Sequence, residues 1–415
     1  MIDIDSVFSP MQQEYLKAKD ARINVLTGSV RSGKSHISLF KFAERIKYSP
    51  MDSLYMFTAL TSNTLVRNVL SVLMGMVGEA NLHYSIGNKD GWLFGHHILL
   101  EYAPDERAEQ KIRGLTIDGA YCDELTLYRE SFFKMLLSRL SKPNATLTAT
   151  TNPDNPNHWL KTGYLDRAEE LDCKVWEFRL EDNTFLDRKY IENIKKEYTG
   201  VFYRRFILGE WVLADGLVFS AFDEGSMLID TPSLESLNGD YAEKYIGIDY
   251  GIENPTAFVL FAWHKTRRQW HIVRDYAYGG RDNIVPKTDD ELYRDLLKFS
   301  EGIDDIKACI VDPSAKSFIV LMQRERSFKV LAADNDVIPG ITFVNTLFSQ
   351  GKLMVARGCT NLRRELFSYS WDTEKSRQTG KDTVLKVNDH NCDAMRYVCR
   401  TAIQPRTRLY GILLS

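Results

Sequence analysis

A phosphate-loop motif is the sequence feature that most restricts the fold of this chain. The segment GSVRSGKS, from Gly28 to Ser35, has two glycines separated by four residues and then Lys and Ser. The apolar residues from Ile23 to Leu26 predict a strand before this loop, and the apolar spacing from Ile37 to Ile46 predicts a helix after it. The order strand, loop, helix predicts an α/β fold that binds a nucleotide at the loop.

The loop and its surroundings supply the candidate nucleotide-binding residues. Its backbone N–H groups are expected to converge on a polyphosphate, which the glycines allow to approach closely. Lys34 is expected to reach the β- and γ-phosphates of ATP, and the Ser35 hydroxyl to ligate Mg²⁺. Gln12 is a candidate for adenine recognition, because its amide carries a donor and an acceptor together. The full candidate set here is Gln12, Gly28, Ser29, Val30, Arg31, Ser32, Gly33, Lys34 and Ser35.

Two adjacent carboxylates, Asp123 and Glu124, end the moderately apolar run GLTIDGAYCDE. Consecutive side chains of a strand point to opposite faces, so these two can have different roles. We expect Asp123 to hold Mg²⁺ through water and Glu124 to polarise the attacking water as the general base. The pair follows the phosphate loop with at least one strand between them, as in additional-strand ATPases.

A strongly β-forming run, ATLTATT, ends just before Asn152 and adds further candidates. It places Thr150, Thr151 and Asn152 at the carboxyl edge of the predicted sheet, where ligands bind in open α/β folds. We expect these residues to sense the γ-phosphate. Arg139, near the end of a predicted helix, is a candidate arginine finger for a neighbouring subunit, with a plain surface arginine as the alternative. Arg31 offers a similar charge to its own site.

The composition is typical of a soluble globular protein. The chain has 415 residues, of which 44% are hydrophobic and 26% charged, and this length predicts two or three domains. No segment is apolar enough to cross a membrane, and the acidic start MIDIDSVF is unlike a signal peptide, so we expect action in the cytosol. A net charge of −3 argues against bulk adhesion to nucleic acid, so DNA contacts must come from local basic patches.

Changes in composition predict three segments. Residues 223–240 are rich in Ser, Gly, Pro and Asp, as in a linker, and a mixed-charge helical stretch that ends in GEW precedes them. We therefore expect a P-loop ATPase domain of additional-strand, RecA-like type at 1–175. A lid subdomain and linker are expected at 176–240, and a second domain at 241–415.

The second domain begins with an apolar strand, YIGID, that ends in Asp249. Two more β runs with a turn between them complete a predicted antiparallel meander. The ribonuclease-H type of fold opens in the same way, with a catalytic Asp in its first strand. A carboxylate in an apolar strand is costly to bury, and a bound metal would offset that cost.

Two more aspartates complete a candidate metal site. Asp312 follows the apolar run at 306–311, and Asp393 lies at the start of the last long helix. Three carboxylates from separate elements suit a two-metal phosphodiesterase with Mg²⁺ or Mn²⁺ ions about 4 Å apart. Asp389 and His390 precede Asp393 by about one helical turn. Each is a candidate ligand, a residue that orients a ligand, or the helix cap.

A phosphate-loop ATPase followed by a ribonuclease-H-like nuclease resembles the large terminase subunit of tailed double-stranded-DNA bacteriophages. The resemblance covers nearly the whole chain, and the residues Asp393, Ala394 and Tyr397 look like the family's terminal Asp-Ala-x-x-Tyr signature. It implies a viral DNA-packaging motor, in which ATP hydrolysis drives DNA translocation and a metal-dependent endonuclease cuts concatemeric DNA. The implied catalytic residues are Glu124, Arg139, Asp249, Asp312 and Asp393.

The resemblance also implies the partners and the place of action. These are double-stranded DNA, a small terminase subunit and the portal protein of the procapsid, in the cytoplasm of the bacterial host. A pentamer on the portal is implied, with a monomer in solution left open, and the tail at 406–415 is implied to touch the portal. One alternative is a nucleotide-switched assembly protein with an inactive nuclease fold. The other is a cellular helicase-nuclease, for which 415 residues hold no second helicase core.

Overall fold

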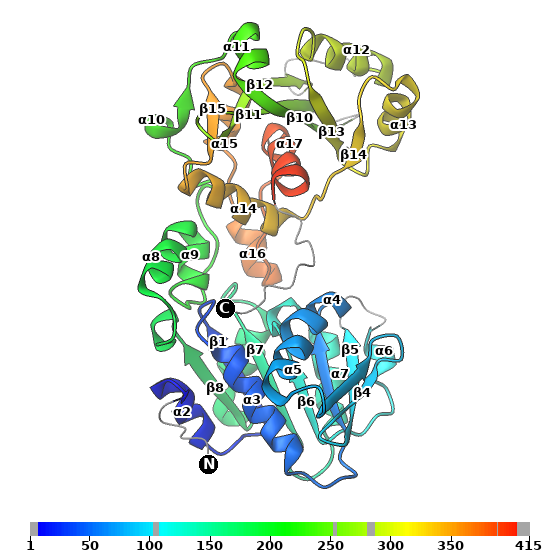
Figure 1. Ribbon diagram of the computed structural model, residues 1–415, viewed down its shortest axis with the longest axis vertical. Helices are drawn as coiled ribbons and strands as arrows, with labels where there is room; N and C mark the ends of the chain where they lie inside the picture. The colour runs from blue at the N-terminus through cyan, green and yellow to red at the C-terminus, as the bar shows by residue number, and fades with distance from the viewer. Residues whose placement is uncertain (1–6, 103–107, 252–254, 280–286, 388, 405–415) are drawn as a thin grey trace. The chain divides into compact units, whose positions relative to one another are not determined.

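The computed structural model describes residues 7–102, 108–251, 255–279, 287–387 and 389–404 (Figure 1). By its internal contacts the chain divides into two units. The first comprises Met1–Lys195, Val201–Ala214 and Glu374–Lys381, and the second Lys196–Gly200, Asp215–Thr373 and Asp382–Ser415. The expected portal-contacting tail, 406–415, lies outside the described residues. Among the helices that are described, none has the length and apolar character needed to span a membrane.

The first unit is built on an eight-stranded sheet with the strand order β3-β4-β5-β2-β6-β7-β1-β8. The strands from β5 to β8 in this order are parallel, and β3 and β4 form an antiparallel edge. Because β7 lies between β1 and β6, the sheet has the additional strand that the sequence predicts. The bounds are β1 (Ile23–Gly28), β2 (Tyr55–Ala59), β3 (Leu82–Ser85), β4 (Asp90–Leu93), β5 (His96–Tyr102), β6 (Gly119–Cys122), β7 (Thr146–Thr151) and β8 (Cys173–Phe178).

Helices cover both faces of this sheet and form a separate core on each. One core gathers α3, α5 and the facing side chains of β2 and β5, and the other gathers α7 with alternate residues of β1, β6 and β7. The helical segments are α2 (Pro10–Lys17), α3 (Lys34–Lys47), α4 (Ser62–Thr64), η1 (Leu65–Leu70), α5 (Ser71–Val77), α6 (Ala108–Lys111), η2 (Leu125–Leu127), α7 (Glu130–Arg139), η3 (Lys161–Leu165), η4 (Ala168–Glu170), η5 (Leu180–Asp182), α8 (Arg188–Glu197) and α9 (Gly200–Phe206).

The second unit is built on a seven-stranded sheet with the strand order β14-β13-β10-β11-β12-β15-β9. The strands β10, β11 and β12 form the predicted antiparallel meander, and β13 and β14 continue parallel to β10 on its other side. This arrangement of five strands is that of the ribonuclease-H fold. The bounds are β9 (Leu228–Ile229), β10 (Tyr241–Asp249), β11 (Thr256–His264), β12 (Gln269–Tyr278), β13 (Ile306–Val311), β14 (Val330–Ala332) and β15 (Leu353–Ala356).

Helix α17 (His390–Val398) packs directly on the central strand β10 of the second sheet. The approach is close because β10 has a glycine at the crossing, where a Cβ on Gly247 would lie 2.1 Å from the Ala394 carbonyl oxygen. This packing brings the start of α17 to the carboxyl end of β10. The other helical segments are α10 (Glu224–Met227), α11 (Leu234–Gly239), α12 (Asp289–Phe299), α13 (Lys316–Glu325), α14 (Val337–Ser349), α15 (Thr360–Leu366) and η6 (Cys399–Ile403). Helix α16 (Thr373–Thr379) belongs from Glu374 onward to the first unit.

The division into units runs differently from the three expected segments. The first sheet continues beyond residue 175, because β8 pairs with β1 along its whole length. Of the expected lid, residues 176–195 and 201–214 belong by their contacts to the first unit, and Lys196–Gly200 belongs to the second. The first unit also takes in Glu374–Lys381 from the C-terminal half, which no sequence pattern indicates.

Candidate functional sites

The phosphate loop connects β1 to α3, and its glycines have backbone conformations that favour glycine. Gly28 has a φ of 140° and Gly33 a φ of 84°. A Cβ on Gly28 would lie 1.9 Å from the Phe178 carbonyl oxygen of β8, so this position tolerates no side chain. The N–H groups of Ser29 and Val30 donate to the carbonyls of Phe178 and Phe206, both at 2.8 Å. These two hydrogen bonds therefore fix the phosphate loop to β8 and α9.

The Lys34 ammonium lies at the centre of the loop. Its Nζ donates to the Asn152 Oδ1 at 2.7 Å and to the Ser29 carbonyl oxygen at 2.9 Å. Burial lowers the pKa of Lys34 to about 8, and the negative charges of Asp123 and Glu124 act in the opposite direction. The predicted phosphate-binding lysine and the predicted γ-phosphate sensor are thus hydrogen-bonded to each other.

Asp123 and Glu124 lie at the end of β6, where β7 holds them. The Thr150 hydroxyl donates to Asp123 Oδ1 at 3.0 Å, and the Asn68 amide donates to Asp123 Oδ2 at 3.0 Å. Burial raises the pKa of both carboxyl groups, and in Asp123 the hydrogen bonds from Asn68 and Thr150 lower it in part. Glu124 has a φ of 55°, which is uncommon for a residue other than glycine and is typical of functional sites. The β7 residue Thr151 supports the next turn through Thr126, with 2.8 Å between their hydroxyl oxygens.

A cavity of about 410 Å³ joins these groups into one site. Its lining includes two residues that the sequence argument missed, Arg67 and Asn68, which come from the π-helical turn η1. The apolar pattern around them predicts an uninterrupted helix, whereas the structure has a π-helical turn here, from which Asn68 reaches Asp123. The cavity is lined by Arg31, Lys34, Ser35, Arg67, Asn68, Val72, Asp123, Glu124, Thr150, Thr151 and Asn152.

Gln12 and Arg139 lie outside this lining, as do the loop residues Gly28, Ser29, Val30, Ser32 and Gly33. Gln12 accepts a hydrogen bond from the Ser9 N–H at 3.1 Å and donates to the Gly33 carbonyl oxygen at 3.4 Å, so it joins α2 to the loop. Arg139 ends α7, and its carbonyl oxygen accepts from the Ile117 N–H just before β6 begins. It therefore lies at the amino edge of the sheet, away from the cavity of its own chain, and its role toward a neighbouring subunit stays a prediction.

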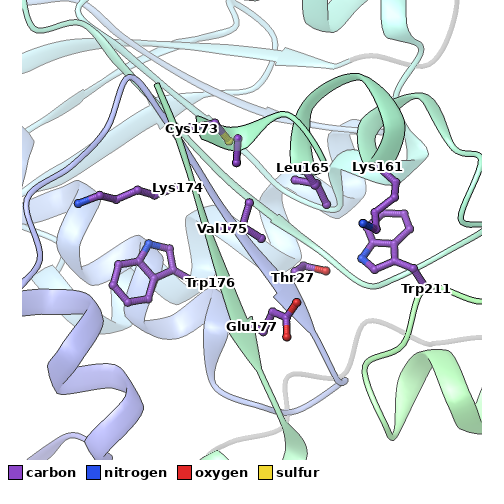
Figure 2. A pocket seen from close by; sticks show the side chains of 10 residues that line it. Thr27, Lys161, Leu165, Cys173, Lys174, Val175, Trp176, Glu177 and Trp211 are labelled. Carbon is purple, nitrogen blue, oxygen red and sulfur yellow. The ribbon is translucent and has the colours of Figure 1, made fainter. Parts of the chain in front are cut away.

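A larger cavity of about 510 Å³ lies beside β8 and η3 in the same unit (Figure 2). Figure 2 shows Trp211, Lys161 and Thr27 around it, and its lining is mainly apolar. None of its lining residues comes from the phosphate loop or from the Asp123 segment. The smaller cavity is therefore the candidate nucleotide site, because it holds the charged and polar groups that a polyphosphate needs.

The second unit brings two of its three predicted aspartates together around one tyrosine. The Tyr397 hydroxyl lies 2.8 Å from Asp312 Oδ2 and 3.2 Å from Asp249 Oδ1. The other Asp249 oxygen lies 2.8 Å from His390 Nδ1. Burial raises the pKa of Asp249, and the contact with His390 lowers it only in part. Tyr397 thus connects the end of β10 to the end of β13, and sequence reasoning gave it no role beyond the family signature.

The third predicted aspartate, Asp393, lies one helical turn before Tyr397 on α17, and cations of the same chain hold both of its oxygens. Arg396 Nη2 donates to Oδ1 at 3.0 Å, and Lys386 Nζ donates to Oδ2 at 2.9 Å. Lys386 Nζ also lies 3.1 Å from Asp389 Oδ2, and the Asp393 N–H donates to the Asp389 carbonyl oxygen at 2.8 Å. Asp389 therefore contributes to the start of α17, and His390 contacts Asp249.

A divalent metal suits the chemistry of this cluster, because carboxylate oxygens are hard ligands. The observed arrangement, however, does not form a metal site. Among the described residues, no three His, Cys, Asp or Glu side chains are close enough to hold one metal ion. The Asp393 carboxylate forms ion pairs with Lys386 and Arg396 instead.

Fold and sites together define a class of protein in which a phosphate-loop α/β unit and a ribonuclease-H-like unit share one chain. Residues 74–226 match the family described as terminase large subunit, T4likevirus-type, N-terminal. The large terminase of a thermophilic bacteriophage is 34% identical, with a TM-score of 0.87 over 95% of this chain and 99% of that one. The chain belongs to the bacteriophage large terminase family.

Other matches agree with this assignment. The same thermophilic-phage terminase in complex with ATP-γ-S is 33% identical, with a TM-score of 0.84 over 95% of this chain and 99% of that chain. Its complex with ADP gives a TM-score of 0.85 at the same identity over 96% of this chain and 100% of that one. The large terminase subunit of Escherichia phage T5 is 23% identical over 275 residues, 65% of this chain. The match spans 61% of the length of the T5 protein.

Proposed function

We propose that the chain is the motor subunit of a viral DNA-packaging machine, with an ATPase site in its first unit and an endonuclease site in its second. One observation carries the ATPase half: a single cavity collects Lys34, Ser35, Asp123, Glu124 and Asn152. The related thermophilic-phage terminase binds ADP and ATP-γ-S. ATP is therefore the proposed substrate of this cavity.

Each group in the cavity has a proposed task. Lys34 binds the β- and γ-phosphates, and in doing so it exchanges Asn152 for a phosphate oxygen. Asn152 thereby reports the nucleotide state to the segment that follows it. Glu124 orients the attacking water, and its raised pKa suits a general base. Mg²⁺ held by Ser35 and Asp123 would neutralise charge on the phosphates.

The remaining candidates act around the phosphates and the base. Arg31 and Arg67 line the cavity and are proposed to balance the developing negative charge. Gln12 is proposed to contact adenine next to the loop. Arg139 is proposed to act on the site of a neighbouring subunit in a pentameric ring.

For the second unit we propose a metal-dependent endodeoxyribonuclease that cuts concatemeric double-stranded DNA. The support is that Tyr397 contacts both Asp249 and Asp312 at the ends of two strands of a ribonuclease-H fold, and that Asp393 lies one helical turn before Tyr397 on α17. Mg²⁺ or Mn²⁺ is the proposed cofactor. His390 is proposed to orient Asp249, which it contacts at 2.8 Å.

The proposed partners are double-stranded DNA, a small terminase subunit and the portal protein, and the proposed place of action is the cytoplasm of the bacterial host. The competing proposal is a nucleotide-switched assembly protein without nuclease activity. Incubation of the purified chain with supercoiled plasmid and Mn²⁺ separates the two. Nicked or linear DNA supports the motor subunit, and intact plasmid at every metal concentration supports the assembly protein.

A further inference from the structure

The two cations that contact Asp393, Arg396 and Lys386, differ in how deeply they are buried in the second unit. The Arg396 side chain is 2% exposed and donates to the carbonyl oxygens of Asn335 and Asp336 at 2.8 and 3.2 Å as well as to Asp393. The Lys386 side chain is 58% exposed and reaches the cluster from the segment before α17. Arg396 is therefore a fixed part of the core, whereas Lys386 can leave without unpacking it.

The Lys386 ammonium lies between two carboxylates, at a position that a divalent cation could occupy. Its Nζ lies 2.9 Å from Asp393 Oδ2 and 3.1 Å from Asp389 Oδ2, and both aspartates are buried. An ammonium group and a metal ion cannot share this position, because each needs the same oxygens and the two repel.

We propose that Lys386 is an internal cation that competes with the divalent metal for Asp393, so that the nuclease site accepts metal only when Lys386 withdraws. The proposal rests on the nuclease function proposed above. It makes Lys386 a positioning residue, which sets the metal affinity of the site without being a ligand itself. Asp249 and Asp312 stay linked through Tyr397 in either state.

Lys386 lies just beyond a loop formed by residues 373–382. The base of this loop is closed by hydrogen bonds from the Asp372 N–H to the Thr383 carbonyl oxygen at 2.8 Å and from the Leu385 N–H to the Ser370 carbonyl oxygen at 3.0 Å. The residues between, Glu374–Lys381, belong to the first unit. There the buried Asn155 amide donates to the Ser376 carbonyl oxygen at 3.1 Å.

Calorimetric titration of the full chain with Mn²⁺ tests the proposal through binding alone. Lys386→Met removes the ammonium and keeps the length of the side chain. We expect it to bind Mn²⁺ about tenfold more tightly than the unmodified chain, which corresponds to loss of one competing ion pair of about 1.4 kcal/mol. The matched control is Lys307→Met, which removes the same charge from an exposed pair with Asp305 at the other end of β13. The control should bind Mn²⁺ as the unmodified chain does.

Further variants keep the test decisive. Asp393→Asn identifies the heat that belongs to this site, and Lys386→Gln replaces Lys386→Met if that variant unfolds. Equal or weaker Mn²⁺ binding by both Lys386 variants, at a site that Asp393→Asn abolishes, overturns the proposal and leaves the nuclease function standing. If no variant binds Mn²⁺ at a site that depends on Asp393, the nuclease function itself is refuted.

Discussion

At the scale of single residues, both sites depend on carboxylates that end a buried strand and that hydroxyl groups hold. Asp123 is held by Thr150 of the neighbouring strand, and Asp249 by Tyr397 of the helix packed on it. Such hydrogen bonds fix the direction of a carboxylate and stabilise its charged form against the effect of burial. Substitutions that remove only the hydroxyl therefore test the sites without disturbing the fold.

Thr150→Val should lower the rate of ATP hydrolysis about tenfold while the chain stays folded, because Asp123 loses a buried hydrogen bond worth about 1–2 kcal/mol. The measurement is steady-state ATPase activity. Thr146→Val on the same strand is the matched control, because the buried Thr146 hydroxyl has no hydrogen-bond partner among the described residues. An ATPase rate equal to that of the unmodified chain in Thr150→Val would show that the bond has no part in catalysis.

Glu365 makes the stability of the second unit depend on pH. It accepts hydrogen bonds from the Asn391 amide at 2.8 Å and the Cys392 N–H at 2.9 Å, and burial raises its pKa to about 7. Between about pH 4.5 and 7 the folded state then binds more protons than the unfolded state, so stability should fall as the pH rises through this window.

In the unmodified chain, the free energy of unfolding should fall by up to about 3 kcal/mol across this pH window because of Glu365. Glu365→Gln should remove this part of the pH dependence, because glutamine does not titrate. Asn391 can follow the change by turning its amide, since its oxygen has no hydrogen-bond partner among the described residues. Urea unfolding at pH 5 and pH 8 measures the effect. If the free energy of unfolding depends on pH in the same way in Glu365→Gln and in the unmodified chain, Glu365 is not the group responsible.

At the scale of elements, the sequence predicts the strands that carry the motifs. It does not predict the neighbouring elements that supply the other residues of the sites. The run at 306–311 predicts β13 with its observed bounds, because it is apolar and closed by Asp312 and a proline. The π-helical turn η1 and the edge strand β8 escape prediction, since a single extra helical residue leaves no mark on the apolar pattern. In β8 exposed positions alternate with buried ones only in part.

The sequence likewise predicts some functional residues and misses others. The phosphate loop and the three aspartates stand out because their chemistry is unusual in apolar surroundings. Arg67 and Lys386 are ordinary charged residues in sequence, and they gain a role only because folding brings them to carboxylates elsewhere in the chain.

The segment Glu374–Lys381 should separate from the first unit when its tight glycine is replaced. Gly380 has a φ of 66°, and a Cβ there would lie 2.5 Å from the Asn157 carbonyl oxygen. Gly380→Ala should therefore speed limited proteolysis within this segment. Gly351→Ala is the control, because Gly351 has a φ of 61° but no atom within 4 Å of the added Cβ. Equal cleavage of the two variants would show that backbone strain alone, about 1 kcal/mol, explains the effect.

At the scale of the whole molecule, two candidate sites share one chain but use separate sheets. The nucleotide cavity draws all its lining from the first unit, and the aspartate cluster draws its contacts from the second. Because the sites share no residue, a substitution in one should leave the chemistry of the other intact. The family relation to the thermophilic-phage terminase predicts the same organisation across 95% of the chain.

The most direct test of this central claim substitutes one residue in each site and measures both activities of each variant. ATP hydrolysis and Mn²⁺-dependent plasmid nicking are measured on the same preparations. Lys34→Ala should lose ATP hydrolysis by at least about a hundredfold and keep nicking, and Asp249→Ala should lose nicking and keep ATP hydrolysis. The loss of both activities in either folded variant, or the loss of neither, would contradict two independent sites on one chain.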